Sequence, residues 1–220
     1  MDRRNLLPAD LYALQVMQPI LNGPYLPFTN SAFRPLCLAY MLNDIVVNSR
    51  KTILEYGSGI STIIMGRLIK MNNTATRIVS VEHNREWAAA MRTAIQREAL
   101  EKTISILHAP LNHCPLAIAP NLWYELDANS EAFEDARFDM IVVDGPPANE
   151  RSIALSRYPA LPFIYDKLSD KCSVFLDDAD REGEKAIISQ WEKEYDIHFN
   201  IIGDSFAYTL RGDSFNLHLF

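Results

Sequence analysis

The segment ILEYGSGIST, residues 53–62, decides the fold class of the chain. It begins with the apolar residues of a buried strand, continues through Gly57 and Gly59, and passes into a helical pattern near Ile60. Glycine lets the backbone turn tightly and approach a ligand closely, and the first turn of a helix offers free N–H groups. The segment therefore predicts a strand, a ligand-binding loop and a helix. A plain tight connection is the alternative that this segment alone leaves open.

Strands and helices alternate along the rest of the chain. Apolar runs of strand length occupy residues 51–56, 76–82, 103–108, 138–144 and 172–177. Amphipathic patterns predict helices over Ile60–Met71, Arg85–Leu100 and Glu182–Tyr195. Residues 196–202 and 206–212 alternate like two strands joined by a turn. This order predicts an α/β fold, with a doubly wound, Rossmann-like and mostly parallel sheet that ends in an antiparallel hairpin.

Two regions interrupt this alternation. Residues 1–50 precede the first strand and predict two helices, around Asp10–Ile20 and Phe33–Val47, as an N-terminal helical extension that acts as a lid. Residues 51–220 form the ligand-binding domain, and since no linker separates the two parts, we expect a single structural domain overall. Residues 109–137 are a long insertion, and long loops in compact domains are often functional. We expect it to cover a substrate together with the N-terminal helices.

The composition excludes several classes of function. The 220 residues include 28 acidic and 21 basic side chains, and the net charge of −7 argues against nucleic acid or an anionic membrane as a partner. The longest apolar run, Leu36–Leu42, is far too short to span a membrane. Three widely spaced cysteines, Cys37, Cys114 and Cys172, indicate reduced thiols. We therefore expect a cytoplasmic protein.

Two acidic residues stand where neighbouring strands end. Glu55 ends the strand before the glycine loop, and Glu82 ends the next strand. A carboxylate at Glu55 would repel a pyrophosphate and attract an ammonium group, whereas Glu82 can accept hydrogen bonds from both hydroxyls of a ribose. A ribose joined to a cationic amino-acid tail describes S-adenosylmethionine (SAM) better than NAD. Thr62 in place of the third glycine of a dinucleotide loop also disfavours an NAD-dependent dehydrogenase.

The motifs EYGSGIST, VEHNREW, VVDGPP, RYPALP and LDDADREGE occur in this order along the chain. Together they resemble bacterial class I SAM-dependent methyltransferases whose acceptor is poorly defined, and the resemblance covers roughly residues 25–195. It implies a cofactor site made of Gly57, Ser58, Gly59 and Ser61 at the methionine moiety, Glu82 at the ribose and His83 at the adenine. Glu55 and Asp144 complete the expected cofactor-binding set. Trp87 shares a helical stripe with Met91, so we interpret it as a core residue rather than an adenine contact.

Three more acids follow two other strands. Asp144 ends the run 138–144, and Asp177 and Asp178 end the run CSVFLDD. Because ligands of open α/β sheets bind beyond the carboxyl ends of the strands, we expect the three to meet there and predict them as catalytic residues. Mg²⁺ or Ca²⁺ held by them would compensate their charges and lower the pKa of an acceptor hydroxyl. Their placement resembles the Asp…Asp-Asn metal set of catechol-type O-methyltransferases, except that Asp178 replaces Asn.

Other interpretations of these aspartates stay open. Asp178 or Asp180 would cap the helix that follows. Arg151 or Arg157 would form an ion pair with Asp144 or with Asp177. Asp144 would also serve alone as a general base, without a metal.

The sequence thus predicts a SAM-dependent methyltransferase that acts on a small-molecule or sugar hydroxyl. An aminopropyltransferase of the same fold and a non-catalytic SAM- or nucleoside-binding protein are the alternatives. The acceptor cannot be identified, because a few loop side chains set pocket specificity. The apolar N-terminal segment would pack on its own core or on a second copy, so a homodimer is one expectation.

Overall fold

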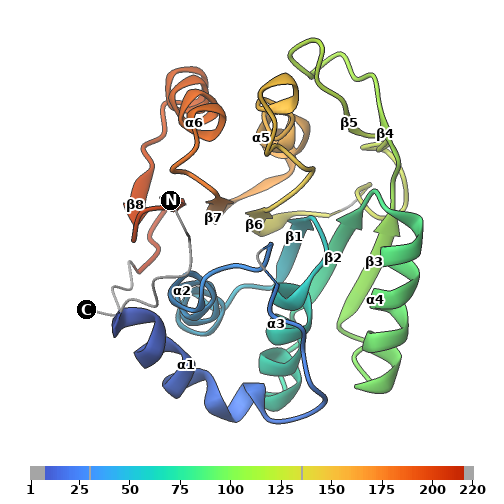
Figure 1. The fold of residues 1–220 in the computed structure, drawn as a ribbon, viewed down its shortest axis with the longest axis vertical. Coiled ribbons are helices and arrows are strands. Elements are labelled where there is room, and N and C mark those ends of the chain that lie inside the picture. Colours follow the sequence, from blue (N-terminus) through green and yellow to red (C-terminus); the bar gives the residue numbers. More distant parts are fainter. Residues whose placement is uncertain (1–7, 30, 135, 216–220) are drawn as a thin grey trace.

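The apolar runs of the sequence form the centre of one sheet (Figure 1). The computed structural model describes residues 8–29, 31–134 and 136–215. The seven-stranded sheet has the order β3-β2-β1-β6-β7-β9-β8. Its strands are β1 (Thr52–Tyr56), β2 (Arg77–Glu82), β3 (Ile104–His108), β6 (Phe138–Val143), β7 (Leu168–Asp177), β8 (Asn200–Ile202) and β9 (Phe206–Arg211). The first five are parallel, and β9 pairs antiparallel with both β7 and β8. The predicted parallel sheet with a terminal hairpin is confirmed.

Helices cover both faces of this sheet (Figure 1). One face carries α1 (Pro8–Leu21), α2 (Pro35–Val47), α3 (Ile60–Met71) and α4 (Arg85–Arg97), and the other carries α5 (Ala160–Ile164) and α6 (Glu182–Tyr195). Short 3-10 helices at Arg151–Ile153 and Tyr165–Lys167 flank α5. This double coverage explains why the strands are apolar nearly throughout, since successive residues point to opposite faces and both faces are buried.

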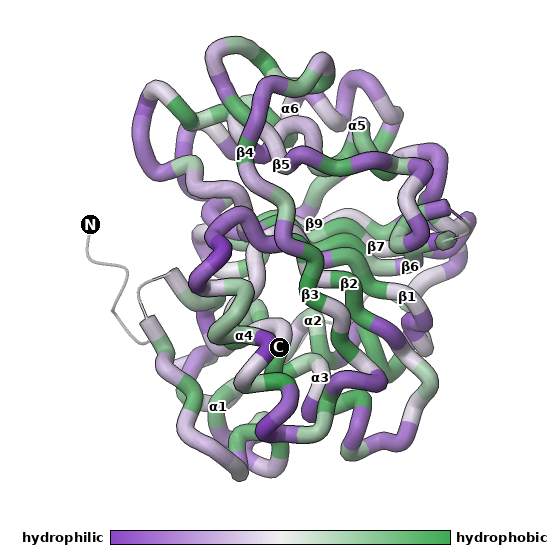
Figure 2. Tube along the Cα trace, turned by 90° about the vertical axis from the view of Figure 1, so that its right-hand side faces the viewer, coloured by the Kyte–Doolittle hydropathy of each residue, from purple (hydrophilic) through white to green (hydrophobic). Residues whose placement is uncertain are grey.

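The core therefore has two halves, one on each side of the sheet. Ile53 and Met140 belong to the half beneath α1 to α4, and their neighbours Leu54 and Ile141 belong to the half beneath α5 and α6. Figure 2 shows the hydrophobic colour gathered along the central strands. Among the described residues, no helix is both long and apolar enough to cross a membrane.

The two N-terminal helices pack into the first half of the core. Leu38 and Met41 of α2 are fully buried, and the hydroxyl groups of Tyr40 and Tyr208 lie 3.1 Å apart in a hydrogen bond. The segment between α1 and α2 is irregular, as the glycine and prolines within it predict.

Some element boundaries differ from the predicted ones. Helix α4 ends at Arg97 rather than Leu100, because Ala99 adopts a left-handed φ of 52° and closes the helix. Strand β7 begins earlier than predicted, at Leu168, and β8 is restricted to Asn200–Ile202.

The insertion 109–137 packs mainly against the second half of the core. It contains a small antiparallel pair, β4 (Leu111–Asn112) and β5 (Trp123–Tyr124). Trp123 and Phe133 are fully buried there. The buried residues of the insertion therefore contribute to this half of the core, and Tyr124 also lines one of the cavities described below.

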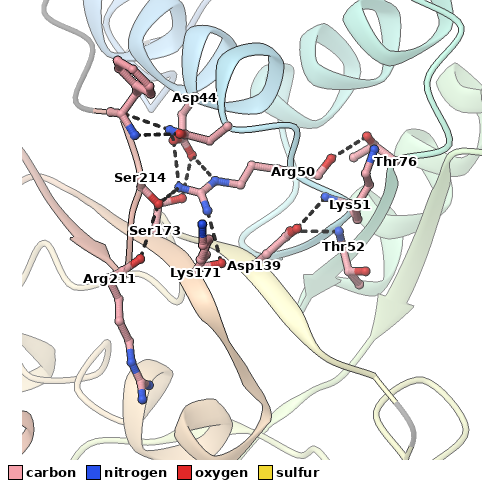
Figure 3. Close-up of polar contacts among 12 residues, drawn as sticks. Asp44, Arg50, Lys51, Thr52, Thr76, Asp139, Lys171, Ser173, Arg211 and Ser214 are labelled. Atoms are coloured by element: carbon pink, nitrogen blue, oxygen red, sulfur yellow. Dashed lines mark hydrogen bonds and ion pairs between the residues drawn. The ribbon is translucent and has the colours of Figure 1, made fainter.

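A buried ion pair joins α2 to the strands at the end of the sheet opposite to the glycine loop (Figure 3). The Arg50 guanidinium donates to both carboxylate oxygens of Asp44 over 2.9 and 3.0 Å, and both residues are nearly inaccessible to solvent. Asp44 also accepts from the Ser173 hydroxyl of β7, and Arg50 donates to the Lys171 carbonyl and the Ser214 hydroxyl. The pair thus links three separate parts of the chain.

We expect Arg50→Met to lower the free energy of unfolding by about 3–5 kcal/mol, because it leaves the Asp44 carboxylate buried without its cation. Urea denaturation followed by circular dichroism measures this loss. The exposed Arg85, changed to Met, is the matched control and should alter stability by less than about 0.5 kcal/mol. A loss below about 1 kcal/mol in Arg50→Met would contradict the importance of the pair.

Candidate active site

The glycine loop between β1 and α3 is held from below by Glu55. This carboxylate is fully buried and accepts hydrogen bonds from the hydroxyls of Ser61, Thr62 and Ser80. The Thr62 hydroxyl in turn accepts from the Gly59 amide over 2.9 Å. Burial raises the pKa of Glu55 to about 6, while the three hydroxyl donors oppose this rise. Glu55 therefore positions the loop through a chain of hydrogen bonds.

This placement changes the role that we expected for Glu55. We predicted that its carboxylate would contact the ammonium group of a ligand. Its side chain instead lies beneath the loop and lines neither of the two cavities described below. A direct contact with a ligand therefore has no support in this geometry, because the protein's own hydroxyls surround the carboxylate.

Gly57 and Gly145 bring two loops into direct contact. Gly57 has a φ of 93°, which favours glycine, and a Cβ atom there would lie 3.0 Å from the Gly145 nitrogen. A Cβ atom on Gly145 would lie 2.9 Å from the Gly57 Cα and 2.2 Å from the Tyr124 hydroxyl. The loops after β1 and β6 can approach this closely only because both positions lack a side chain. Our sequence interpretation missed Gly145, although the Gly-Pro-Pro after Asp144 marked a special turn.

Glu82, the last residue of β2, presents an ionised carboxylate beside the loop. It accepts from the backbone amides of Ser58 and Asn84 and lies 3.0 Å from the His83 ring. Burial would raise its pKa, but these hydrogen bonds outweigh burial and hold the pKa below its ordinary value. A carboxylate has about four acceptor positions, so three donors leave about one for a ligand hydroxyl.

Asp144, Asp177 and Asp178 do converge at the ends of β6 and β7. One oxygen from each lies within 4.8 Å of the others. Burial raises the pKa of Asp144 well above its ordinary value, and the neighbouring Asp177 raises it further, while Arg157 lowers it. Asp144 is thus a comparatively basic carboxylate at a strand end.

Arg157 lies buried among these acids. Its Nη2 atom is 3.4 Å from Asp144 Oδ1 and 3.2 Å from Asp178 Oδ2, and it donates to the Asp144 carbonyl over 3.0 Å. Its other nitrogens donate to the carbonyls of Asp177 and Pro146. Burial alone would lower the pKa of Arg157, but the surrounding carboxylates raise it, so the guanidinium is charged. Of the two arginines considered from the sequence, Arg157 makes the pairing.

A fourth acid, Glu184 of α6, was missed in the sequence, although its spacing from Ile187 and Trp191 places it on the buried side of the helix. It is fully buried, and within the described part of the chain neither carboxylate oxygen has a hydrogen-bond partner. Arg157 and Arg181 lie 3.5 and 3.7 Å from it. Burial raises the pKa of Glu184 to about 7 despite these two cations. Arg181 occupies the N-cap position of α6 and makes no side-chain capping hydrogen bond. Neither Asp178 nor Asp180, the two caps considered from the sequence, holds that position.

The three aspartates suit a hard cation in donor type and spacing, but Arg157 argues against one. A buried guanidinium already lies against two of the three carboxylates. A divalent ion bound to the same oxygens would meet this fixed positive charge at close range. The residues present therefore do not fit a metal site well.

Two adjoining cavities open above the glycine loop. The smaller, of about 350 Å³, is mostly polar, and the larger, of about 450 Å³, is mostly apolar. Of the residues predicted to bind the cofactor, Gly57, Ser58, Glu82, His83 and Asp144 line the smaller cavity, and Gly59 and Ser61 line the larger. Asp177 and Asp178 also line the smaller cavity. The sequence therefore placed most of the expected residues at one location.

Trp87 corrects one of our interpretations. We expected a core residue, but 42% of its surface is exposed, and it lines the larger cavity. Its indole N–H donates to the Ser58 carbonyl over 2.8 Å. Ala88, Met91 and Ile95 form the buried stripe of α4 instead.

Comparison with known families decides the relationship. The sequence model of a family described as "Methyltransferase domain" matches residues 54–179, which is more than half of the chain.

The chain belongs to this methyltransferase family.

Solved structures similar to the methyltransferase share its fold across nearly the whole chain. A methyltransferase from Podospora anserina with bound SAH (S-adenosylhomocysteine) is 15% identical, with a TM-score of 0.63. The match covers 94% of this chain and 89% of that one. An O-methyltransferase from Bacillus cereus in complex with SAH is 17% identical, with a TM-score of 0.61 and 94% of both chains covered. The O-methyltransferase TomG from Streptomyces achromogenes, in complex with SAM, is 15% identical, with a TM-score of 0.54 and coverages of 93% and 90%. No curated protein sequence matches the chain.

These matches confirm the class I SAM-dependent methyltransferase superfamily and the Rossmann-like fold predicted from the sequence. They lend no support to the aminopropyltransferase alternative or to a non-catalytic binding protein. The methyltransferase differs from its similar structures in most residues, so its own side chains must supply the argument about its reaction.

Glu184 should make the stability of the methyltransferase depend on pH. Its pKa is about 7 in the folded protein and 4.5 when unfolded, so the folded state binds more protons between these values and stability falls as pH rises through them. We expect Glu184→Gln to be more stable than wild type at pH 8 by about 3 kcal/mol and about equally stable below pH 4. Urea unfolding at several pH values tests this.

Glu182, in the same helical turn but exposed, provides the control for this experiment. Its change to Gln should leave the pH profile of wild type unaltered. A Glu184→Gln profile parallel to that of wild type would show that Glu184 titrates normally.

Proposed function

We propose that this methyltransferase transfers a methyl group from SAM to the hydroxyl of a small molecule. One observation carries the proposal: Glu82 and Asp144, from the ends of two separate strands, line the same cavity over the glycine loop. An ionised carboxylate suited to a ribose hydroxyl and a basic carboxylate suited to an acceptor hydroxyl thus lie in one space. The O-methyltransferases among the similar structures are consistent with transfer to oxygen.

The smaller cavity has the chemistry that a nucleoside requires. Besides Glu82, it is lined by Tyr124, whose hydroxyl is buried and has no hydrogen-bond partner within the described part of the chain. Burial raises the pKa of Tyr124 well above its ordinary value, so this hydroxyl is a neutral donor. A buried polar atom without a partner costs free energy, which a bound polar ligand recovers. Gly59 leaves open space above the loop, since a Cβ atom there would meet no atom within 4 Å.

Asp144 is the group we propose for proton removal. SAM, when bound, supplies an electrophilic methyl group on a sulfonium sulfur, and S-adenosylhomocysteine (SAH) is the second product. The Asp144 carboxylate takes the proton of the acceptor hydroxyl as the acceptor oxygen forms its bond to the methyl carbon and the bond between that carbon and sulfur breaks. Its raised pKa favours this role, because a general base works best when its pKa lies near the working pH. Asp177 and Asp178 assist by shaping the potential around it.

A titration with nucleotide ligands tests the cofactor. We expect SAM and SAH to raise the melting temperature and to give saturable heats in calorimetry, and NAD to do neither. Absence of any response to SAM and SAH would overturn the proposal and return the glycine loop to the role of a plain connection.

In place of a metal, we propose that Arg157 compensates the charge of the aspartates. Methyl transfer should then proceed at the same rate, within about twofold, in Mg²⁺ and in excess EDTA. Calorimetric titration of the protein with MnCl₂ should show no saturable binding at these carboxylates. A rate loss above tenfold in EDTA that Mg²⁺ reverses would overturn the role of Arg157 and favour the metal site considered from the sequence.

A further inference from the structure

The two cavities above the glycine loop meet at three residues. Ser31, Ser58 and Asp144 line both of them. In a direct transfer between two bound molecules, the reacting atoms must come within van der Waals distance. If a nucleoside occupies the polar cavity, the reacting oxygen must therefore lie at this shared boundary, next to Asp144. The rest of the acceptor then extends into the larger cavity.

The walls of the larger cavity, which we term the apolar chamber, come from three parts of the chain. They are residues 24–29 and 31–33, the start of α3 and one side of α4. Its apolar lining includes Leu26, Phe33, Ile60, Ile63, Trp87 and Met91. Its volume of about 450 Å³ lies in the range of pockets that hold small organic molecules.

Three of the polar side chains at the chamber wall already have partners within the protein. The Ser61 hydroxyl donates to Glu55, and the Ser58 hydroxyl shares a hydrogen bond with Ser80. Glu98 is held by Arg67 through two short ion-pair contacts. The rest of the lining is predominantly apolar, so a ligand with many hydroxyls would leave several of them unsatisfied, and each unsatisfied hydroxyl costs free energy on burial.

We propose that the apolar chamber binds the acceptor and that the acceptor is a hydroxyl compound with an apolar ring system, rather than a sugar. This inference rests on the proposed function for the identity of the reaction. It goes further in assigning the chamber and the substrate class. The acceptor hydroxyl lies at the Asp144 boundary, and its rings lie against the side chains of α3 and α4.

Two neighbouring alanines of α4 allow a matched test. Ala90 lines the chamber, whereas Ala89 lines neither cavity, and both are exposed. Ala90→Trp places a large ring in the chamber, and Ala89→Trp adds the same bulk outside it. The probes are 2-naphthol, which has one hydroxyl on an apolar ring system, and myo-inositol, which is a polyol.

Calorimetry of each protein is run with each probe, both in the free state and saturated with SAH. We expect wild type and Ala89→Trp to bind 2-naphthol equally, Ala90→Trp to bind it at least tenfold more weakly, and myo-inositol to show no binding. Affinity for SAH should stay within about twofold in both variants. Equal binding of 2-naphthol to the two variants, or preference of wild type for myo-inositol, would overturn the assignment.

The two proposals can fail separately. If wild type does not bind SAH, the proposed cofactor is wrong. Binding of 2-naphthol that is weakened by Ala90→Trp but not by Ala89→Trp would still support the chamber. Normal SAH binding combined with 2-naphthol binding that is indifferent to position 90 would overturn the chamber alone.

Discussion

Replacing Asp144 by Asn should lower the rate of methyl transfer by about 10²–10⁴-fold, the usual contribution of a general base. The amide retains the shape of the side chain but cannot take a proton. Single-turnover assays with SAM labelled in its methyl group, together with a ring-bearing hydroxyl compound found by screening, measure this loss. Affinity for SAH should fall much less than the rate, because Asp144 is one of several residues predicted to bind the cofactor but the only one proposed to take the proton.

Asp180→Asn is the control for this experiment, since Asp180 follows the same strand end as Asp177 and Asp178 but is exposed. It should retain nearly full activity. If Asp144→Asn keeps a rate within about threefold of wild type while Asp177→Asn or Asp178→Asn loses activity, the base is one of those two residues and Asp144 is not.

The second large effect is expected at Glu82. Its replacement by Ala should weaken SAH binding by about 100-fold, because it removes a hydrogen bond to a charged acceptor and also releases the Ser58 and Asn84 amides. Calorimetry measures the affinity, and circular dichroism checks that the fold is retained. Glu86→Ala, an exposed glutamate in the first turn of α4, should bind SAH like wild type.

Normal SAH affinity in Glu82→Ala would remove Glu82 from the nucleoside site. Glu82→Gln distinguishes the two contributions, because the amide oxygen still accepts hydrogen bonds while the charge is lost. We expect its affinity to lie between those of wild type and Glu82→Ala.

The sequence was sufficient to predict the sheet and the location of the site, for a local reason. Parallel strands end at one edge of a sheet, so acids that close successive apolar runs must meet there. Glu82 and Asp144 could be placed in this way without any knowledge of distant contacts. The glycine loop was equally visible, because Gly57 and Gly59 separate a strand pattern from a helix pattern.

The remaining features depend on neighbours that are distant in sequence. Glu55 turned away from the cavity because Ser80, on the adjacent strand, is in register to donate to it. Trp87 was interpreted as a core residue of α4, but a hydrogen bond from its indole N–H to the Ser58 carbonyl holds the ring at the cavity. The spacing of Glu184 placed it on the buried side of α6, but only tertiary packing brings Arg157 beside it, so its part in the acidic cluster was missed.

The arrangement of the three tryptophans gives the protein an intrinsic optical reporter. Trp123 and Trp191 are sealed in the core, whereas Trp87 stands partly open at the mouth of the apolar chamber. Fluorescence that iodide or acrylamide can quench therefore arises chiefly from a single indole next to the glycine loop. Emission from this indole can follow occupancy of the chamber in real time, with no label attached to the chain.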